Sequence, residues 1–296
     1  MSVTAVVVTY NRLNYLKEVI YALQNSEITP NNIVVVDNNS NQDTVDYLES
    51  LGNQIRYVRL QTNLGGAGGF NKGVRYFMEQ TRDEFVWLMD DDTVPKSNTL
   101  KELLAFAKET PDFGFLASDV RWIDGTRARM NNPAPKNRLK KIPEDATQPE
   151  ELMNATFVSL FMKRSVVDII GLPITDFFIW GDDIEYTERA ARVAPGYFIP
   201  AAQVVHKMAT NVGSNIMNDS LDRLPRYFYS YRNKVYYGSK RNWIGHLKSN
   251  VRILLEAMRL LFTPGVDNRL KRFGVLIRGV KAGFTFDPEI EFSDKD

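Results

Sequence analysis

The sequence predicts an α/β fold with a mostly parallel sheet flanked by helices, followed by a basic helical region. In the first hundred residues, continuous apolar runs alternate with segments of helical periodicity. That alternation is typical of strands buried on both faces and joined by right-handed crossover helices. From about residue 221 the pattern becomes helical, aromatic and basic. We therefore expect one domain over residues 1–220 and a basic aromatic helical region over residues 221–296.

The elements of the first domain follow from these patterns in order. Apolar runs predict strands, at residues 3–8, 33–36, 55–60 and 85–89. Apolar spacings of three and four predict helices, at residues 13–23, 44–51 and, after a glycine-rich turn, 71–80. Residues 131–150 are rich in Pro, Asn and Lys and predict a long surface loop. Beyond this loop we expect a strand over 156–162 and a helix that starts within 166–170.

Composition excludes several kinds of site. The 296 residues include no cysteine, which excludes disulfides, thiolate zinc sites and cysteine nucleophiles. The best apolar stretch, Ile253 to Phe262, is shorter than the roughly 20 residues that span a bilayer, and it contains Glu256 and Arg259. No signal peptide is expected, because the chain enters its first strand at Val3. We therefore expect a cytoplasmic protein that does not span a membrane.

Polar motifs follow the apolar runs of the predicted sheet. In open parallel sheets, ligands bind beyond the carboxyl ends of the strands, so these motifs are the first candidates for a site. The motifs are Thr9-Tyr10-Asn11-Arg12, Asp37-Asn38-Asn39-Ser40, Asn63 to Gly69, and Asp90-Asp91-Asp92. We expect all of them to lie along one edge of the sheet.

The aspartate triplet at 90–92 predicts a divalent metal site. Adjacent carboxylates repel one another unless a cation neutralises them. Their hard oxygen ligands favour Mg²⁺ or Mn²⁺, which keep open positions for water and substrate phosphates. The alternative is a solvated acidic turn that caps the helix beginning near Ser97.

Two other motifs each allow two interpretations. The glycines between Gly65 and Gly69 could let the backbone approach a phosphate at a helix N-terminus, or could form a structural tight turn. Asp37 could accept hydrogen bonds from a base or ribose, or could cap the next helix.

Later in the chain, Asp182 and Asp183 follow the aromatic stretch that ends at Trp180 and Gly181. One of these carboxylates could act as a general base, although acidic residues in a helical first turn are also common for structural reasons. His206 ends another apolar stretch and could complete a metal site that the aspartates begin, or could be structural.

Taken together, these motifs resemble family 2 glycosyltransferases of the GT-A fold over roughly residues 3–235. The glycine run from Asn63 to Phe70, the triplet at 90–92 and the acidic segment from Asp182 to Tyr186 are most similar to bacterial galactofuranosyltransferases. Rhamnosyltransferases are close. The resemblance implies an inverting, metal-dependent transfer of galactofuranose from UDP-galactofuranose to a glycan or lipid-linked acceptor in cell-surface polysaccharide synthesis. TDP-rhamnose is the alternative donor.

The resemblance also implies roles for individual residues. Asp90, Asp92 and His206 would hold Mn²⁺ or Mg²⁺, and Asp183 would be the general base. Trp180 and Asp182 would contact the acceptor, although Gly181 departs from the expected tryptophan-Asp-Asp order and weakens a stacking role for the indole. The donor would be contacted by Thr9, Tyr10, Asn11, Arg12, Asp37, Asn63, Gly65, Gly66 and Asp91.

Charge is segregated in the helical region, where residues 221–281 contain 14 Lys and Arg against 3 Asp and Glu. This basic aromatic composition favours contact with an anionic membrane at the inner face of the plasma membrane. Alternatively, the aromatics pack on the first domain, with Arg232 and Asn233 near its site. A nucleic-acid-binding protein is disfavoured because the positive charge lies in the helical region while the predicted groove is acidic. A nuclease or nucleotidyltransferase that uses the three aspartates is the enzymatic alternative, and it would require a phosphate-ester substrate. The composition is compatible with a homo-oligomer.

Overall fold

The computed structural model describes residues 1–137 and 139–294. It divides into two compact units. The first unit comprises residues 1–175, 183–212 and 290–296, and the second comprises residues 176–182 and 213–289. The sequence-based division after residue 220 stays a prediction for the functional domains.

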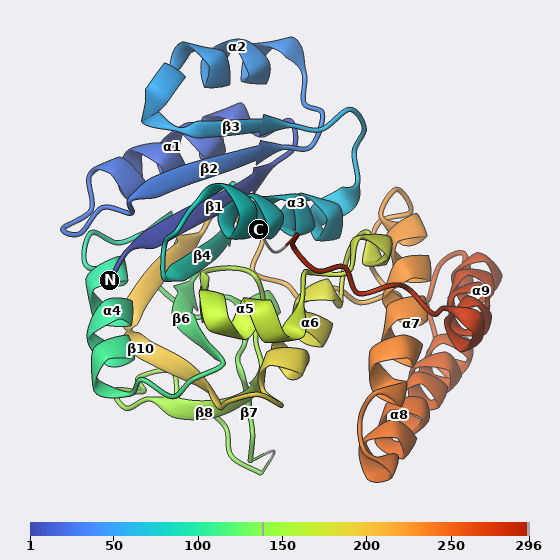
Figure 1. Ribbon diagram of the computed structural model, residues 1–296. Coiled ribbons are helices and arrows are strands. Elements are labelled where there is room, and N and C mark those ends of the chain that lie inside the picture. Colours follow the sequence, from blue (N-terminus) through green and yellow to red (C-terminus); the bar gives the residue numbers. More distant parts are fainter. Residues whose placement is uncertain (138, 295–296) are drawn as a thin grey trace. The chain divides into compact units, whose positions relative to one another are not determined.

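A single mixed sheet forms the centre of the first unit, with strand order β3-β2-β1-β4-β9-β6-β10-β8-β7 and β5 paired to β10 (Figure 1). Parallel pairing joins β3, β2, β1 and β4, and also joins β6 to β10, whereas β9 is antiparallel to both β4 and β6. The strands are β1 (Val3–Thr9), β2 (Asn32–Asp37), β3 (Arg56–Arg59), β4 (Phe85–Asp90), β5 (Thr93–Pro95), β6 (Phe115–Arg121), β7 (Ala134–Pro135), β8 (Glu150–Asn154), β9 (Leu160–Lys163) and β10 (Gly196–His206).

Helices cover both faces of this sheet. Alternate residues of β1 pack into two separate cores: Val7 lies with α1 and α4, and Val6 lies with α3 and α5. The helices of the first unit are α1 (Leu13–Gln24), α2 (Gln42–Ser50), α3 (Gly65–Gln80), α4 (Thr99–Glu109), α5 (Arg164–Ile170) and α6 (Asp182–Ala190), whose first residue belongs to the second unit. The predicted α/β sheet, buried on both faces, is confirmed.

The second unit is built from α7 (Leu224–Ser239), α8 (Trp243–Phe262) and α9 (Arg269–Thr285). These helices enclose their own hydrophobic core, to which Tyr227, Tyr231 and Leu260 contribute buried side chains. The helical character expected from residue 221 is therefore confirmed. Among the aromatic side chains of α7, Tyr227, Phe228 and Tyr231 serve this internal core.

Two boundaries differ from the sequence-based prediction. The strand expected over 156–162 is β9, which starts only at Leu160, because Ser159 has φ +61° and interrupts the extended backbone. The loop expected over 131–150 contains β7, and β8 begins at its end. These edge strands are short or partly exposed, so they show little of the apolar periodicity that reveals a strand.

The largest difference concerns the glycine run, which is helical instead of forming a turn before residue 71. The helix α3 starts at Gly65, because its glycines let its backbone approach β1 closely. A Cβ atom on Gly69 would lie 2.4 Å from Val8 Cγ1, and one on Gly73 would lie 2.2 Å from Val6 Cγ1. The missing side chains offset the low helix propensity of glycine.

Gly73→Ala is therefore expected to lower the free energy of unfolding by about 1–3 kcal/mol through overpacking against β1. The matched control is Gly66→Ala in the same helix, where an added Cβ meets no atom within 4 Å. That control should leave the free energy of unfolding unchanged or raise it slightly. Urea unfolding of both variants is the measurement, and equal destabilisation by the two would contradict this account of the glycines.

Candidate active site

The carboxyl ends of three parallel strands bring the predicted motifs to one edge of the sheet. Thr9, the last residue of β1, is in register with Asp37 of β2, and Val8 is in register with Asp90 of β4. The glycine-run motif joins this edge through Asn38, whose side chain accepts from Leu64 N at 2.8 Å and donates to Gly65 O at 2.7 Å. The predicted gathering of the four motifs is therefore observed.

Asp90, Asp92 and His206 offer ligand atoms that all lie within 4.8 Å of one another. Different elements supply them: Asp90 ends β4, Asp92 precedes β5, and His206 ends β10, where it pairs with Thr93 of β5. This is the spacing that one divalent cation needs to be held by two carboxylates and an imidazole. Residues 116 positions apart in the sequence are thus assembled by strand pairing.

The hydrogen bonds around His206 fit a cation at this position. His206 Nδ1 lies 2.8 Å from Asn131 Oδ1, an acceptor, so Nδ1 holds the proton and Nε2 presents its lone pair. Nε2 lies 3.1 Å from Asp92 Oδ1, but the two atoms are not aligned as a hydrogen bond. Asp92 Oδ1 is buried and accepts no hydrogen bond from any described residue. A lone pair facing an unsatisfied carboxylate oxygen is the arrangement that a metal ion resolves.

The charge balance of the triplet also favours a divalent cation. Arg12 Nη1 contacts Asp92 Oδ2 and lies 3.6 Å from Asp91 Oδ1, so one guanidinium faces three carboxylates. Burial, together with the charge of Asp92, raises the pKa of Asp90 to about 6. Asp91 and Asp92 are each 4% exposed, which rules out the alternative of a solvated acidic turn.

The two other acids of the triplet respond differently to their surroundings. Burial raises the pKa of Asp91 to about 7, although the charge of Arg12 opposes this. Burial also acts to raise the pKa of Asp92, but the positive charge of Arg12 beside it acts against burial, and that pKa is lowered. Asp91 faces β1, where its Oδ2 accepts from Thr9 Oγ1 at 2.7 Å and from Tyr10 N at 3.3 Å.

Asp37 lies beneath this edge and holds the turns that form it. It is fully buried, and its oxygens accept from Ser40 N at 2.8 Å and from Tyr57 Oη at 3.0 Å. Ser40 Oγ in turn accepts from Asn11 N at 2.9 Å, which links the β2 turn to the β1 turn. The side chain that caps α2 is Asn41, so the helix-capping interpretation of Asp37 was wrong. Its contact with a donor stays a prediction.

The start of α3 combines a helix N-terminus with free space. Gly65 has φ +72°, a conformation that favours glycine, and its N–H donates to Asn63 Oδ1 at 2.8 Å. Gly66 has no atom within 4 Å of the position that a Cβ would take. An anion could therefore approach the backbone at this end of the helix.

A strained loop precedes Asp182. Phe178 and Trp180 have φ of +61° and +63°, an uncommon conformation for bulky residues that surrounding contacts must maintain. The fully buried Asn233 of α7 supplies those contacts, because its Nδ2 donates to the carbonyls of Phe177, Ile179 and Trp180 at 2.8–3.3 Å. Arg232 donates to Asn233 Oδ1 at 3.0 Å and orients this amide.

Trp180 and the two acids after it form a second group. The Trp180 ring packs on Tyr227, with a centroid separation of 5.0 Å, and the Arg223 guanidinium lies 5.7 Å from its centroid. Asp182 is buried and Asp183 is half-buried, both in the first turn of α6, where the helix dipole stabilises negative charge. Contact of Trp180 and Asp182 with an acceptor stays a prediction.

Ion pairs and hydrogen bonds anchor α6 itself. Glu185 and Arg189 pair at 2.9 Å on one side of the helix, and Arg189 also donates to the carbonyl of Leu172 at 3.0 Å. Thr187 Oγ1 donates to the carbonyl of Asp183 at 2.7 Å. The backbone that presents Asp183 is thus fixed by buried polar contacts.

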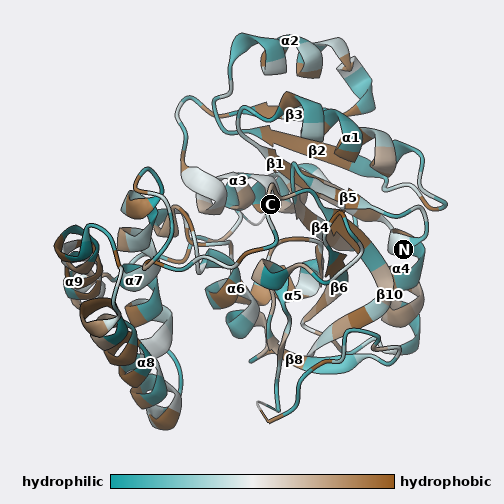
Figure 2. Ribbon diagram, turned by 180° about the vertical axis from the view of Figure 1, so that it is seen from behind, coloured by the Kyte–Doolittle hydropathy of each residue, from teal (hydrophilic) through white to brown (hydrophobic). Residues whose placement is uncertain are grey.

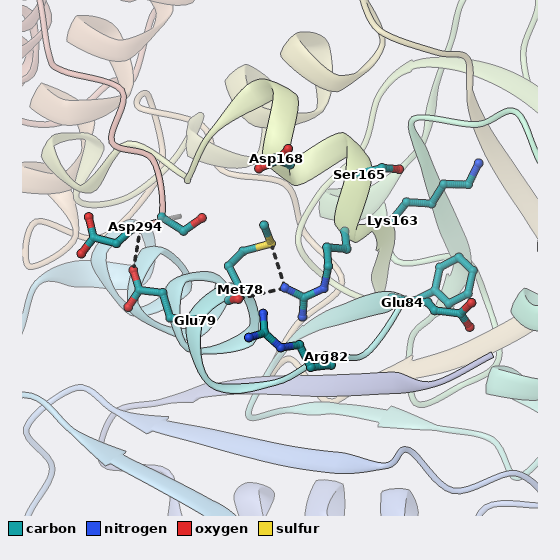
Figure 3. A pocket seen from close by; sticks show the side chains of 11 residues that line it. Met78, Glu79, Arg82, Glu84, Lys163, Ser165, Asp168 and Asp294 are labelled. Carbon is teal, nitrogen blue, oxygen red and sulfur yellow. Dashed lines mark hydrogen bonds between the residues drawn. The ribbon is translucent and has the colours of Figure 1, made fainter. Parts of the chain in front are cut away.

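A cavity of about 670 Å³ lies at the other end of β4, near its first residue Phe85 (Figure 3). Two of its basic side chains are already engaged: Arg164 donates to the carbonyls of Phe77, Met78, Thr81 and Asp83, and Lys163 lies over the Phe113 ring. Ligands of parallel sheets bind at the carboxyl ends of the strands, so we assign the site to the edge with the aspartates.

Asn131 was not singled out from the sequence, and the hydrogen bonds that Asn233 and Ser40 make were not predicted. Asn131 lies in a short 3₁₀ turn (Arg129–Asn131) without periodicity, and Asn233 lies within an aromatic helix. Each holds another residue by a contact between distant parts of the chain, and such contacts leave no local pattern.

Comparison with known proteins agrees with this geometry. The model of the family described as Glycosyl transferase family 2 matches residues 4–171. Galactofuranosyltransferase GlfT1 of Mycobacterium tuberculosis is 30% identical over 251 residues, which cover 79% of this chain and 81% of the relative. GlfT1 of Mycolicibacterium smegmatis is 25% identical over 249 residues, covering 79% and 82% of the two chains.

Solved structures share the fold at low sequence identity. S. aureus TarS 1–349 in complex with UDP is 17% identical with a TM-score of 0.55, and the match covers 97% of this chain and 73% of that one. The chain spans 44% of the longer TarS chain. GalNAc-T7 with UDP, GalNAc and Mn²⁺ is 13% identical with a TM-score of 0.61, covering 94% of this chain and 55% of that one.

The fold is therefore the GT-A fold. Because the family model matches more than half of the residues and a relative at 30% identity is covered over most of its length, the chain belongs to glycosyl transferase family 2 and is a glycosyltransferase.

Proposed function

We propose that this enzyme is an inverting, metal-dependent transferase that moves galactofuranose from UDP-galactofuranose to a glycan or lipid-linked acceptor in cell-surface polysaccharide synthesis. The observation that supports the metal-dependent part best is the cluster of Asp90, Asp92 and His206, with Asn131 fixing the imidazole. The names of the galactofuranosyltransferase relatives support the choice of sugar. We place the reaction at the inner face of the plasma membrane.

Asp90, Asp92 and His206 would hold Mn²⁺ or Mg²⁺. When bound, such an ion stabilises the negative charge that develops on a departing diphosphate. Arg12 would add its positive charge to the same diphosphate, because its guanidinium already lies against Asp91 and Asp92. Gly66 would contribute its N–H group at a helix N-terminus, and Gly65, whose N–H donates to Asn63, would form the turn that lets the donor approach.

The remaining donor contacts follow from the rim of the site. Thr9, Tyr10 and Asn11 form the turn after β1, and Asn63 orders the turn before α3. Asp37 would support the nucleotide pocket through Ser40 and Asn11. Asp91 would face the donor sugar from its position beside Thr9.

Asp183 would act as the general base. Its carboxylate would take the proton from the acceptor hydroxyl as that oxygen bonds to the anomeric carbon and the bond to the diphosphate breaks. One displacement inverts the anomeric centre, and the enzyme forms no covalent intermediate. Trp180 and Asp182 are proposed to contact the acceptor because they lie within three residues of this base in the chain.

A donor screen tests the proposal. Release of nucleoside diphosphate is measured with UDP-galactofuranose, TDP-rhamnose, UDP-galactose and UDP-glucose, each with Mn²⁺, Mg²⁺ or EDTA. We expect UDP-galactofuranose to exceed every other donor by at least about 10-fold, and EDTA to abolish the reaction. A preference for TDP-rhamnose would contradict the assignment of galactofuranose as the transferred sugar, and full activity in EDTA would contradict the metal dependence.

A further inference from the structure

The long helix α8 has two apolar faces, of which only one is covered. One face packs into the core of the second unit through Ile253, Ala257 and Leu260. The other face is exposed, with Trp243 at 75% and Phe262 at 71% at its two ends. In Figure 2, hydrophobic segments recur along the length of α8. The exposed apolar residues, called the α8 stripe below, are Trp243, Ile244, Leu247, Val251, Leu254, Leu255, Met258 and Phe262.

The spacing of the α8 stripe makes it continuous. Its members recur at intervals of three and four residues, so they line one side of the helix, opposite the buried residues. Twenty helical residues extend for about 30 Å. An apolar band of this length on an exposed helix indicates an interaction surface.

Basic side chains border the α8 stripe. Lys248, Arg252 and Arg259 are exposed on the same helix. The helix contains a single acidic residue, Glu256, and Lys234 of α7 pairs with it at 3.2 Å. The surface around the stripe is therefore apolar and positively charged, which complements anionic lipid headgroups over an acyl layer.

The α8 stripe also replaces the surface expected from the sequence. Membrane contact was expected from the aromatic residues between Tyr227 and Trp243, but Tyr227, Tyr231 and Tyr236 are buried in the second unit. Trp243 is the member of that set with the largest exposed fraction. The basic charge and the exposed apolar area thus come together on α8 instead of α7.

We propose that the α8 stripe docks the enzyme in the plane of an anionic membrane surface. No described helix is long and apolar enough to cross a bilayer, and a helix with basic residues beside an apolar stripe lies at the interface instead. A second copy is a poorer occupant, because a symmetric contact would bring the basic borders of two α8 helices together. Docking would hold the enzyme where lipid-linked acceptors reside, and it does not depend on which sugar is transferred.

Co-sedimentation of the full chain with vesicles tests this surface without donor or acceptor. The vesicles contain phosphatidylcholine alone or with 30% phosphatidylglycerol, a typical anionic composition. We expect binding to the anionic vesicles and at least about a 10-fold weaker association for the double variant Leu247→Glu, Leu254→Glu. The control is Ile169→Glu, which adds one negative charge at an exposed apolar position of α5 in the first unit. It should bind at least half as well as the wild type.

Tryptophan fluorescence locates the contact. The emission of Trp243 should shift to shorter wavelength on addition of anionic vesicles, and the Trp243→Phe variant should still sediment with them but lose most of the shift.

Equal binding by the double variant and the wild type, or an unchanged shift in Trp243→Phe, would overturn the proposal. The proposal would also be overturned if the wild type did not bind vesicles and light scattering showed a dimer that the double variant disrupts. Nucleotide release with a water-soluble acceptor should be unchanged in the double variant, so a failure of docking is distinguishable from a failure of the proposed reaction.

Discussion

Replacing Asp183 by Asn is expected to lower the rate of sugar transfer by about 10²–10⁴-fold, because an amide cannot take the proton from the acceptor hydroxyl. The affinity for the donor should change by less than about 2-fold, since the metal and diphosphate contacts are assigned to other residues. Nucleoside diphosphate release with acceptor measures the first quantity, and titration calorimetry with donor and Mn²⁺ measures the second. Asparagine keeps the size of the side chain and the acceptor oxygen that Ile184 N uses at 2.7 Å, so the start of α6 should remain folded.

The matched control is Asp176→Asn, the same chemical change in the segment before α6. Asp176 is exposed, and its backbone carbonyl, which accepts from Arg232, is unaffected by the substitution. This variant should keep at least about half of the wild-type turnover. Near-normal turnover by Asp183→Asn would remove Asp183 as the base. A parallel loss of donor affinity would instead indicate that it positions the donor.

The fold was predictable because its dominant signals are local. Each central strand is a nearly unbroken apolar run, since parallel strands are buried on both faces, and the helices between them show clear periodicity. The rule that ligands bind at the carboxyl ends of parallel strands identifies Thr9, Asp37 and Asp90 from the sequence. The glycine run failed as a local signal. Its glycines allow the helix to pack closely against Val6 and Val8 of β1. The sequence around residue 65 does not show which strand the helix will contact.

The site was predictable in its charged residues and not in the residues that hold them. A triplet of aspartates can be recognised directly in the sequence. The role of Asn131 can be recognised only in the fold, where β10 brings His206 beside it. Asn233 donates hydrogen bonds to three backbone carbonyls more than fifty positions away. These bonds hold Trp180 in its strained conformation, which is defined by backbone angles and leaves no sequence pattern. The side chains of Asn131 and Asn233 are polar amides, and the composition around them suggests a loop and a helix surface, so the sequence gives no sign of their roles.

His206→Ala is expected to weaken Mn²⁺ binding by more than about 100-fold and to remove the Mn²⁺ dependence of donor binding. The substitution deletes the nitrogen ligand and leaves Asp90 and Asp92 facing each other across the site. Electron paramagnetic resonance of free Mn²⁺ measures the metal affinity, and calorimetry with and without Mn²⁺ measures the effect on the donor.

A comparison with Asn131→Ala separates the role of His206 as a metal ligand from the role of Asn131 in orienting the imidazole. Asn131→Ala removes the acceptor for His206 Nδ1 and the hydrogen bond to Thr156 Oγ1 but keeps all three candidate ligands, so Mn²⁺ affinity should fall by about 10–100-fold, less than on loss of the imidazole. His246→Ala, in α8, is the control, because His246 contacts Asn250 and belongs to the second unit. It should bind Mn²⁺ like the wild type. If His206→Ala also bound Mn²⁺ normally, the aspartates alone would hold the ion, and the 3.1 Å contact between His206 and Asp92 would have to be an ion pair of a protonated imidazole.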